Sequence, residues 1–139
     1  MTQESAKRVI RVSAVVMRDA AGRVLNVRKR GTVTFMLPGG KPEIDEAPVD
    51  TALREFEEEI GIALERGLLR SLGVFRAAAA NEPDHLVEAA VFEHPLVAEA
   101  RTAEPRAEIE AIEWVDPATK RADMAPLNTE LIFPALLEA

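Results

Sequence analysis

The segment that decides the fold of this chain is Gly39-Gly40-Lys41-Pro42-Glu43-Ile44-Asp45-Glu46, followed after a short spacer by Arg54-Glu55-Phe56-Glu57-Glu58-Glu59-Ile60-Gly61-Ile62. The first part combines two glycines with a proline, a composition typical of a turn. The second part is rich in glutamate and has apolar residues at helical spacing. The segment therefore predicts a glycine loop that leads into a helix carrying clustered carboxylates.

The helix is predicted over residues 48–60. Pro48 suits the first helical turn, where its missing N–H has no intrahelical partner, and Gly61 suits the left-handed conformation that ends many helices. With about 100° of rotation per residue, the apolar residues fall on one side: Val49, Ala52, Leu53, Phe56 and Ile60. Three glutamates at spacings of three and four fall on another side: Glu55, Glu58 and Glu59. One face is therefore expected to pack on the core, and the other to hold three neighbouring carboxylates.

Carboxylates at these spacings repel one another and destabilise a helix by roughly 0.2–0.5 kcal/mol per pair. Hard divalent cations such as Mg2+ or Mn2+ bind clustered carboxylate oxygens, with waters and phosphates in the remaining positions. Arg54 stands four residues before Glu58, within reach to hold that carboxylate. A glutamate-rich helix alone is most often a solvated surface, to which we assign Glu57. The helix by itself therefore does not establish a metal site.

The glycine loop before the helix favours the metal-site interpretation. Gly39 and Gly40 permit a close backbone approach that leaves carbonyls free to face a metal or N–H groups free to face a phosphate. Together, the loop and the helix predict a metal-dependent phosphate site.

These residues resemble the signature of the Nudix hydrolases. Gly40, five residues, Glu46, seven residues and then residues 54–62 match that signature at every fixed position. A pattern that fixes about eight positions rarely matches by chance. Two residues depart from the commonest form: Asp45 stands where glycine is frequent, and Phe56 where an aliphatic residue is more usual. These departures concern the shape of the loop, because neither residue is a presumed ligand.

The resemblance implies an α/β/α sandwich with a mixed β-sheet, which agrees with the predicted order of strands and helices. It also implies a metal-dependent hydrolase that cleaves a pyrophosphate bond in a nucleoside diphosphate-linked substrate, with Mg2+ or Mn2+ as cofactor. Metals supply charge neutralisation and a nucleophilic water in such reactions. Glu55, Glu58 and Glu59 are expected to serve as metal ligands or base, with the carbonyl of Gly40 or Gly39 as a further ligand. We expect Glu55 or Glu58 to take part in catalysis, Arg54 to orient the carboxylates, and Glu46 to support them.

A glutamate outside the signature often supplies a further ligand or the base in the resembled family. The candidate here is Glu108, at the start of a predicted strand, with four alternatives: Glu110, Glu104, Glu82 and Glu88. Each of these residues taken alone is more often a surface residue.

Residues 9–17 and 24–30 are predicted to form a hairpin around a turn at residues 19–22. The second strand ends in the densest basic cluster of the chain, Arg28-Lys29-Arg30. One interpretation is a solvated strand edge; the other is that Arg28 or Arg30 reaches a substrate phosphate. Gly39 and Lys41 complete the candidates for substrate binding.

Further strands are predicted at residues 35–37, 68–76, 86–92 and 108–115, with a loop at 98–106. Asn128 or Thr129 is expected to cap a terminal helix built on residues 131–137. Pro134 conflicts with an unbroken helix, so this helix should kink or start late.

Composition limits the class of protein. With 139 residues, 47% of them hydrophobic, we expect one domain over residues 1–139, with residues 1–7 as a flexible tail. No apolar run approaches the roughly 18 residues of a membrane span, and no signal-peptide pattern follows the first residues, so a cytoplasmic location is expected. The absence of cysteine excludes thiolate ligands and cysteine nucleophiles.

The net charge of -7 argues against a general nucleic-acid-binding surface. The expected partner is a small nucleotide-type molecule, with a nucleoside triphosphate or a nucleotide sugar preferred. The alternative function is a sensor or binding module without significant turnover. An isomerase of the isopentenyl diphosphate type calls for a cysteine that this chain lacks. The sequence leaves open whether the chain forms a homodimer.

Overall fold

The structure is a computed structural model that describes residues 8–138, so the predicted tail at residues 1–7 lies outside the described part. The helical elements are α1 (Pro48–Ile60), η1 (Arg66–Leu68), η2 (Ala98–Thr102), η3 (Leu127–Ile132) and α2 (Phe133–Glu138). The range predicted for the first helix is confirmed. Pro48 occupies its first turn, and Gly61 ends it with φ 82° and an N–H bond to Glu57 O. No helix in the described range is long and apolar enough to cross a bilayer.

The strands form two sheets. They are β1 (Arg8–Val16), β2 (Val24–Lys29), β3 (Phe35–Met36), β4 (Gly39–Gly40), β5 (Arg70–Ala78), β6 (His85–Glu93) and β7 (Ile109–Val115). The larger sheet has the order β4-β1-β6-β5 and is mixed, because β1 runs parallel to β6 while the other pairs are antiparallel. The smaller sheet, β3-β2-β7, is antiparallel.

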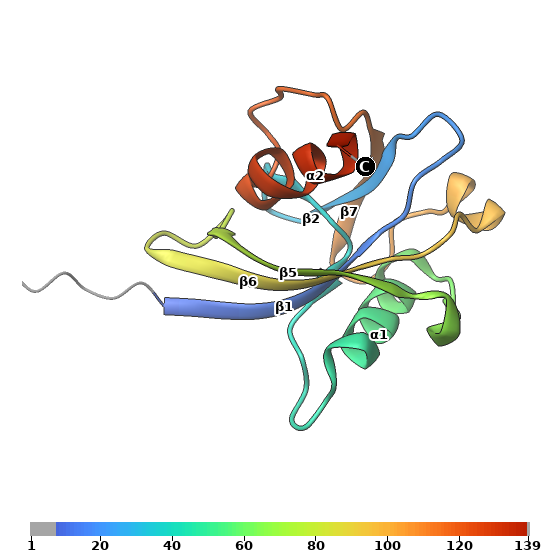
Figure 1. The fold of residues 1–139 in the computed structure, drawn as a ribbon, viewed down its shortest axis with the longest axis horizontal. Helices are drawn as coiled ribbons and strands as arrows, with labels where there is room; N and C mark the ends of the chain where they lie inside the picture. Colours follow the sequence, from blue (N-terminus) through green and yellow to red (C-terminus); the bar gives the residue numbers. More distant parts are fainter. Residues whose placement is uncertain (1–7, 139) are drawn as a thin grey trace, which may run out of the picture.

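Helices cover both sides of the strands, with α1 on one side and α2 on the other (Figure 1). The alternation of side chains along β1 explains this arrangement. Val15 packs in one apolar cluster with Phe56 of α1, whereas Ala14 and Val16 pack in a second cluster with Phe133 of α2. The predicted α/β/α sandwich with a mixed sheet is confirmed.

The predicted hairpin of the first two strands is wrong. β1 and β2 belong to different sheets and meet only near their connecting turn, through a bridge between Arg18 and Val24 and a 3.0 Å bond from Leu25 N to Met17 O. Residues 13–17 are buried on both faces, which requires β1 to be a central strand with neighbours on either side. β6 and β4 fill these positions.

The terminal helix starts with wide π-helical turns in η3 and becomes α-helical only at Phe133, one residue before Pro134. This agrees with the prediction of a late start, because proline is tolerated in a first α-helical turn. The predicted capping role of Asn128 is wrong. That residue lies inside the helical segment, and its side chain bonds to Asn26 of β2.

β4 brings the backbone of Gly39 and Gly40 directly against β1, with Gly39 opposite Ala14 and Gly40 opposite Ser13. A Cβ atom at position 39 would lie 2.1 Å from Ser13 O and 2.8 Å from Ala14 Cα. Both are backbone atoms, so only glycine permits this pairing.

We expect Gly39→Ala to lower the free energy of unfolding by at least the ~1–3 kcal/mol typical of overpacking, because the backbone of β1 cannot move aside. Gly67→Ala is the control, since a Cβ atom there meets nothing within 4 Å. Thermal denaturation of both variants measures the difference. Equal melting temperatures for the two variants would contradict the close approach at Gly39.

Candidate functional site

Arg54 fastens the loop formed by residues 41–47 to α1. Its guanidinium donates to both oxygens of Glu46, from Nε at 2.9 Å and from Nη2 at 2.8 Å, and to Lys41 O at 3.0 Å. Its Nη1 also donates to Glu55 Oε2 at 2.9 Å and to Glu58 Oε1 at 3.4 Å. Arg54 therefore joins the loop to two of the three clustered glutamates.

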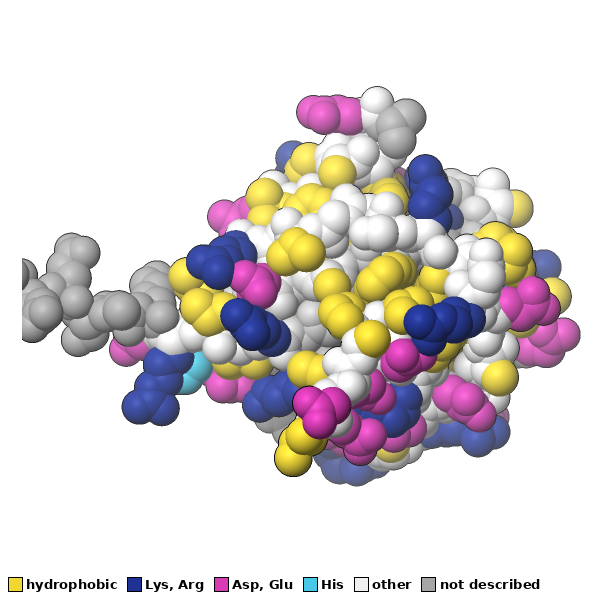
Figure 2. Space-filling model, turned by 60° about the horizontal axis from the view of Figure 1, so that its bottom comes forward, with side chains coloured by type: hydrophobic (Ala, Val, Ile, Leu, Met, Phe, Trp, Pro, Cys, Tyr) yellow, Lys and Arg dark blue, Asp and Glu magenta, His cyan; other side chains and the backbone are white. Residues whose placement is uncertain are grey.

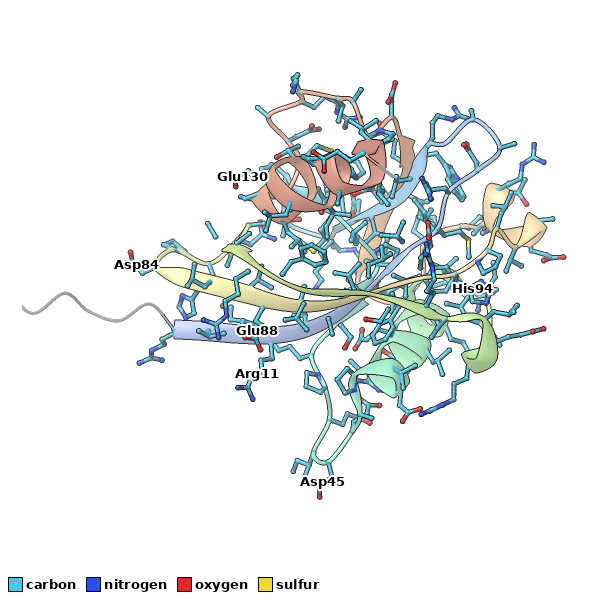
Figure 3. The ribbon with its side chains drawn as sticks, in the orientation of Figure 1. Arg11, Asp45, Asp84, Glu88, His94 and Glu130 are labelled. Atoms are coloured by element: carbon cyan, nitrogen blue, oxygen red, sulfur yellow. The ribbon has the colours of Figure 1, made fainter. Side chains whose placement is uncertain are left out.

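Glu46 is held as a charged carboxylate. The hydrogen bonds from Arg54, reinforced by the backbone N–H of Glu43, lower the pKa of Glu46 to about 2. Thr51 Oγ1 donates a further bond to Glu46 at 2.8 Å. The loop is thereby closed onto the start of α1. At its tip, Asp45 adopts φ 61°, a left-handed conformation that explains the preference for glycine at this position and that aspartate tolerates (Figure 3).

Glu59 has the opposite environment. Its side chain is only 1% exposed, and Oε1 accepts a 3.1 Å bond from Gly39 N, while Oε2 has no partner among the described residues. Burial, helped by the charge of Glu55, raises the pKa of Glu59 to about 8. Because Gly39 N–H is bonded to Glu59, the structure does not leave it free for a phosphate.

Glu55 lies between these two groups. Gly40 packs directly on its carboxylate, because a Cβ atom at position 40 would lie 2.4–2.7 Å from the Glu55 carboxyl atoms. Burial raises the pKa of Glu55, and the hydrogen bond from Arg54 opposes that shift. The absence of a side chain at Gly40 therefore allows Glu55 to approach the glycine loop.

A cleft of about 410 Å³ opens beside this cluster. Its charged lining residues are Lys29, Lys41, Glu55, Glu82 and Glu108, and the remaining lining is mostly aliphatic. Figure 2 shows one face of the molecule, on which acidic and basic side chains gather below a band of hydrophobic ones. The cleft can therefore accept a ligand with one charged part and one apolar part.

The structure brings some of the predicted residues to the cleft and not others. Gly39, Gly40, Lys41, Glu55 and Glu108 line it. Four other predicted residues are not among the lining residues: Glu46, Arg54, Glu58 and Glu59.

Arg28 and Arg30 are not among the residues that line the cleft. Arg28 donates to Thr32 O at 2.8 Å, and Arg30 pairs with Glu110 at 3.5 Å. Lys29, between them, lines the cleft instead. Side chains of a strand alternate, so Lys29 shares a face with the apolar Leu25 and Val27, and this alternation in the sequence was the missed signal.

Glu108 contacts Lys29 of the neighbouring strand, at 3.3 Å from its Nζ, and its charge helps to raise the pKa of Glu55 and Glu59. Among the alternatives, only Glu82 also lines the cleft. Glu88 pairs with Arg11 on the neighbouring strand (Figure 3). The geometry therefore supports Glu108 over the other glutamates outside the signature.

The donor set of this cluster suits a hard divalent cation, which takes carboxylate and carbonyl oxygens. The unpartnered buried Oε2 of Glu59 is the strongest sign of fit, since a buried acceptor without a partner is unfavourable. The ligands are not already converged, because no group of three acidic or histidine side chains within residues 8–138 has metal-site geometry. Arg54 holds Glu55 and Glu58 in their present rotamers, so binding requires these side chains to turn.

Asn128 is a residue of the cleft that the sequence did not indicate as a site residue. It is fully buried, lines the cleft from η3, and its Oδ1 has no partner among the described residues. No local pattern could have shown this, because its partner Asn26 lies far away in the sequence.

Comparisons with known proteins agree with this geometry. The NUDIX domain model matches residues 7–133, so the chain belongs to the NUDIX domain family. A MutT-like protein from Streptomyces ambofaciens is 43% identical over 56 residues, or 40% of this chain. That match covers only 36% of the relative's length.

Two solved structures illustrate the shared fold. The MutT protein from Methanosarcina mazei Go1 is 22% identical, with a TM-score of 0.74 over 97% of each chain. A bifunctional NMN adenylyltransferase/ADP ribose pyrophosphatase from Francisella tularensis, complexed with AMP and a Mn ion, is 17% identical. Its TM-score is 0.69 over 95% of this chain and 42% of that chain.

We expect Glu59→Gln to stabilise the metal-free protein increasingly as the pH rises. Burial raises the pKa of Glu59 from 4.5 to about 8, so the folded state disfavours the charged carboxylate. Stability is therefore lost as the pH rises from about 4.5 to 8, by up to about 1.4 kcal/mol per pH unit for one proton. Glutamine cannot ionise and avoids this loss. Melting temperatures in EDTA at pH 5 and pH 8 measure the effect.

Glu57→Gln is the control, because Glu57 is exposed on the same helix. Its melting temperature relative to wild type should change little between the two pH values. A Glu59→Gln difference that does not grow with pH would contradict the buried environment of this carboxyl.

Proposed function

We propose that this chain is a metal-dependent hydrolase that cleaves a pyrophosphate bond in a nucleoside diphosphate-linked substrate. The observation that carries the proposal is the buried carboxylate of Glu59, with one unpartnered oxygen and a raised pKa, beside Glu55 at a cleft that also contains two lysines. A buried oxygen without a partner favours a cation beside it, and the two lysines offer positive charge to phosphates. Membership of the NUDIX domain family supports the same chemistry.

Members of the family generally use divalent metals. The residues that would hold Mg2+ or Mn2+ here are the carboxylates of Glu55, Glu58 and Glu59, with the carbonyl of Gly40. Bound there, the ion supplies charge neutralisation on the phosphoryl oxygens and a more acidic water. Arg54 lies within reach of both Glu55 and Glu58, so it would orient these side chains once they turn toward the ion.

The other residues of the site have complementary roles in this proposal. Lys29 and Lys41 attract the phosphates, because they are the basic side chains that line the cleft. The base that accepts the proton of the attacking water is Glu55, Glu58 or Glu108. Of these, Glu55 and Glu108 line the cleft.

The apolar part of the cleft suits a nucleobase. Aliphatic side chains such as Val12, Leu37 and Leu127 line it, and none of its described lining residues is aromatic. A base would therefore lie between aliphatic walls, with the amide of Asn128 as a polar contact. This supports a nucleoside triphosphate or a nucleotide sugar as substrate.

The predictions of one domain over residues 1–139 and of a cytoplasmic location stay predictions.

The test is phosphate release with and without Mg2+ or Mn2+, coupled to a pyrophosphatase for nucleoside triphosphates, whose cleavage releases pyrophosphate. For nucleotide sugars, ADP-ribose, NADH and diadenosine polyphosphates, whose cleavage gives products with terminal phosphates, the coupling enzyme is a phosphomonoesterase. Metal-dependent turnover of one compound supports the proposal. Nucleotide binding without turnover on any compound would favour a sensor or binding module instead.

We expect Glu58→Gln to lower kcat by at least about 100-fold, because it removes a charged ligand or base. The fold should remain intact, since this side chain is 52% exposed and contacts Arg54 at 3.4 Å. Glu57→Gln is the matched control, one position away on the exposed surface. Full activity of Glu58→Gln at saturating Mg2+ would contradict the assignment.

We expect Lys29→Gln to raise KM about tenfold, equivalent to about 1.4 kcal/mol, with a smaller change in kcat. The reason is the loss of a positive charge from the cleft. Arg30→Gln removes a neighbouring charge that pairs with Glu110 outside the cleft, so its KM should stay near wild type. Steady-state kinetics on the best substrate of the panel distinguish the two variants. A larger effect at Arg30 than at Lys29 would contradict the assigned strand face.

A further inference from the structure

Two buried asparagines connect β2 to the terminal helix. Asn26 of β2 and Asn128 of η3 are both fully buried. Asn128 Nδ2 donates to Asn26 Oδ1 at 2.6 Å, and Asn26 Nδ2 donates to Val24 O at 3.1 Å. The two side chains therefore form a chain of hydrogen bonds that begins at a backbone carbonyl.

This chain allows one orientation of each amide. Val24 O can only accept, so Asn26 must turn its Nδ2 toward that carbonyl and its Oδ1 toward Asn128. Two amide oxygens repel each other, so Asn128 must present Nδ2 to Asn26. Consequently the oxygen of Asn128 is the atom left without a partner among the described residues.

Asn128 also lines the cleft, next to aliphatic residues such as Leu37 and Leu127. An unpartnered acceptor in such a setting is unfavourable until a donor reaches it. A purely structural link between β2 and η3 would work equally well with two apolar side chains, which leave no polar atom unpaired. The asparagine pair therefore has a use beyond packing.

We propose that Asn26 is a positioning residue that locks the Asn128 amide with its oxygen toward the ligand, so that the cleft selects a ring bearing an N–H donor. The proposal rests on the nucleotide-type substrate proposed above and specifies which chemical edge of the base is recognised. Asn26 does not touch the ligand; it acts only through the orientation of Asn128.

The test compares the affinity of natural nucleotides with that of donor-free references. ATP and GTP are each paired with purine riboside triphosphate, and CTP and UTP with pyrimidin-2-one riboside triphosphate. Neither reference ring carries an N–H group. Calorimetry with Ca2+ in place of Mg2+ measures binding to wild type, and phosphate release with Mg2+ is measured separately. At least one natural nucleotide should bind wild type at least about tenfold more tightly than its reference.

Two variants of Asn26 distinguish positioning from packing. Asn26→Leu removes the hydrogen bond that orients the Asn128 amide. The affinity ratio of the natural nucleotide to its donor-free reference should therefore fall below about threefold. Asn26→Asp keeps the acceptor oxygen for Asn128 Nδ2 and should retain the preference. A packing role would predict similar affinity ratios in both variants. Circular dichroism and thermal melting check that each variant is folded.

A preference that survives in Asn26→Leu, or that is missing from wild type, overturns the proposal. So does failure of every nucleotide to bind. Selective binding without phosphate release supports the proposal while rejecting the hydrolase function. If Asn26→Leu does not fold, a crystal structure of wild type with its best nucleotide decides. A ring or amino N–H of the base at hydrogen-bond distance from Asn128 Oδ1 supports the proposed orientation, and contact through Nδ2 or no contact overturns it.

Discussion

The site depends on how closely the backbone at Gly39 and Gly40 approaches its neighbours. On one side Gly39 pairs with β1 at a distance that excludes a Cβ atom, and on the other Gly40 rests on the carboxylate of Glu55. The same approach lets Gly39 N–H reach Glu59. A two-residue strand thus ties the central sheet to the acidic face of α1, and any side chain there would separate the two.

The carboxylates of α1 and of the loop before it have very different environments. Arg54 satisfies Glu46, Glu55 and Glu58 from the solvent side, which is why Glu46 keeps its charge. Glu59 points inward, receives only one hydrogen bond and favours its neutral form. Glu59 is therefore the carboxyl group of the acidic face that Arg54 does not compensate, and it lies next to Glu55, whose pKa is also raised by burial. This asymmetry makes the inner carboxylates, rather than the whole glutamate run, the place where a cation would be most stabilising.

Local signals predicted local structure well. The bounds of α1 could be predicted from Pro48, Gly61 and the helical spacing of the apolar residues. The residue types also indicated that the glycine loop belongs to the same site as the glutamates, and Gly40 does pack on Glu55. The partners of β1 could not be predicted in this way, because they come from distant segments and depend on burial of both faces. Proximity in sequence instead suggested a hairpin with β2.

The cleft also combines residues that local sequence could identify with residues that depend on distant segments. Lys29 could have been identified from strand alternation, since it follows the buried positions 25 and 27. Asn128 could not, because its role depends on the contact with Asn26. Two buried oxygens remain unpartnered among the described residues, Glu59 Oε2 and Asn128 Oδ1, on elements from opposite sides of the sheet (Figure 1). The first is best satisfied by a cation and the second by an N–H donor. A metal-bound phosphate joined to a nitrogenous ring brings a cation for Glu59 and an N–H donor for Asn128. A simple phosphate or an apolar ligand would not bring both partners.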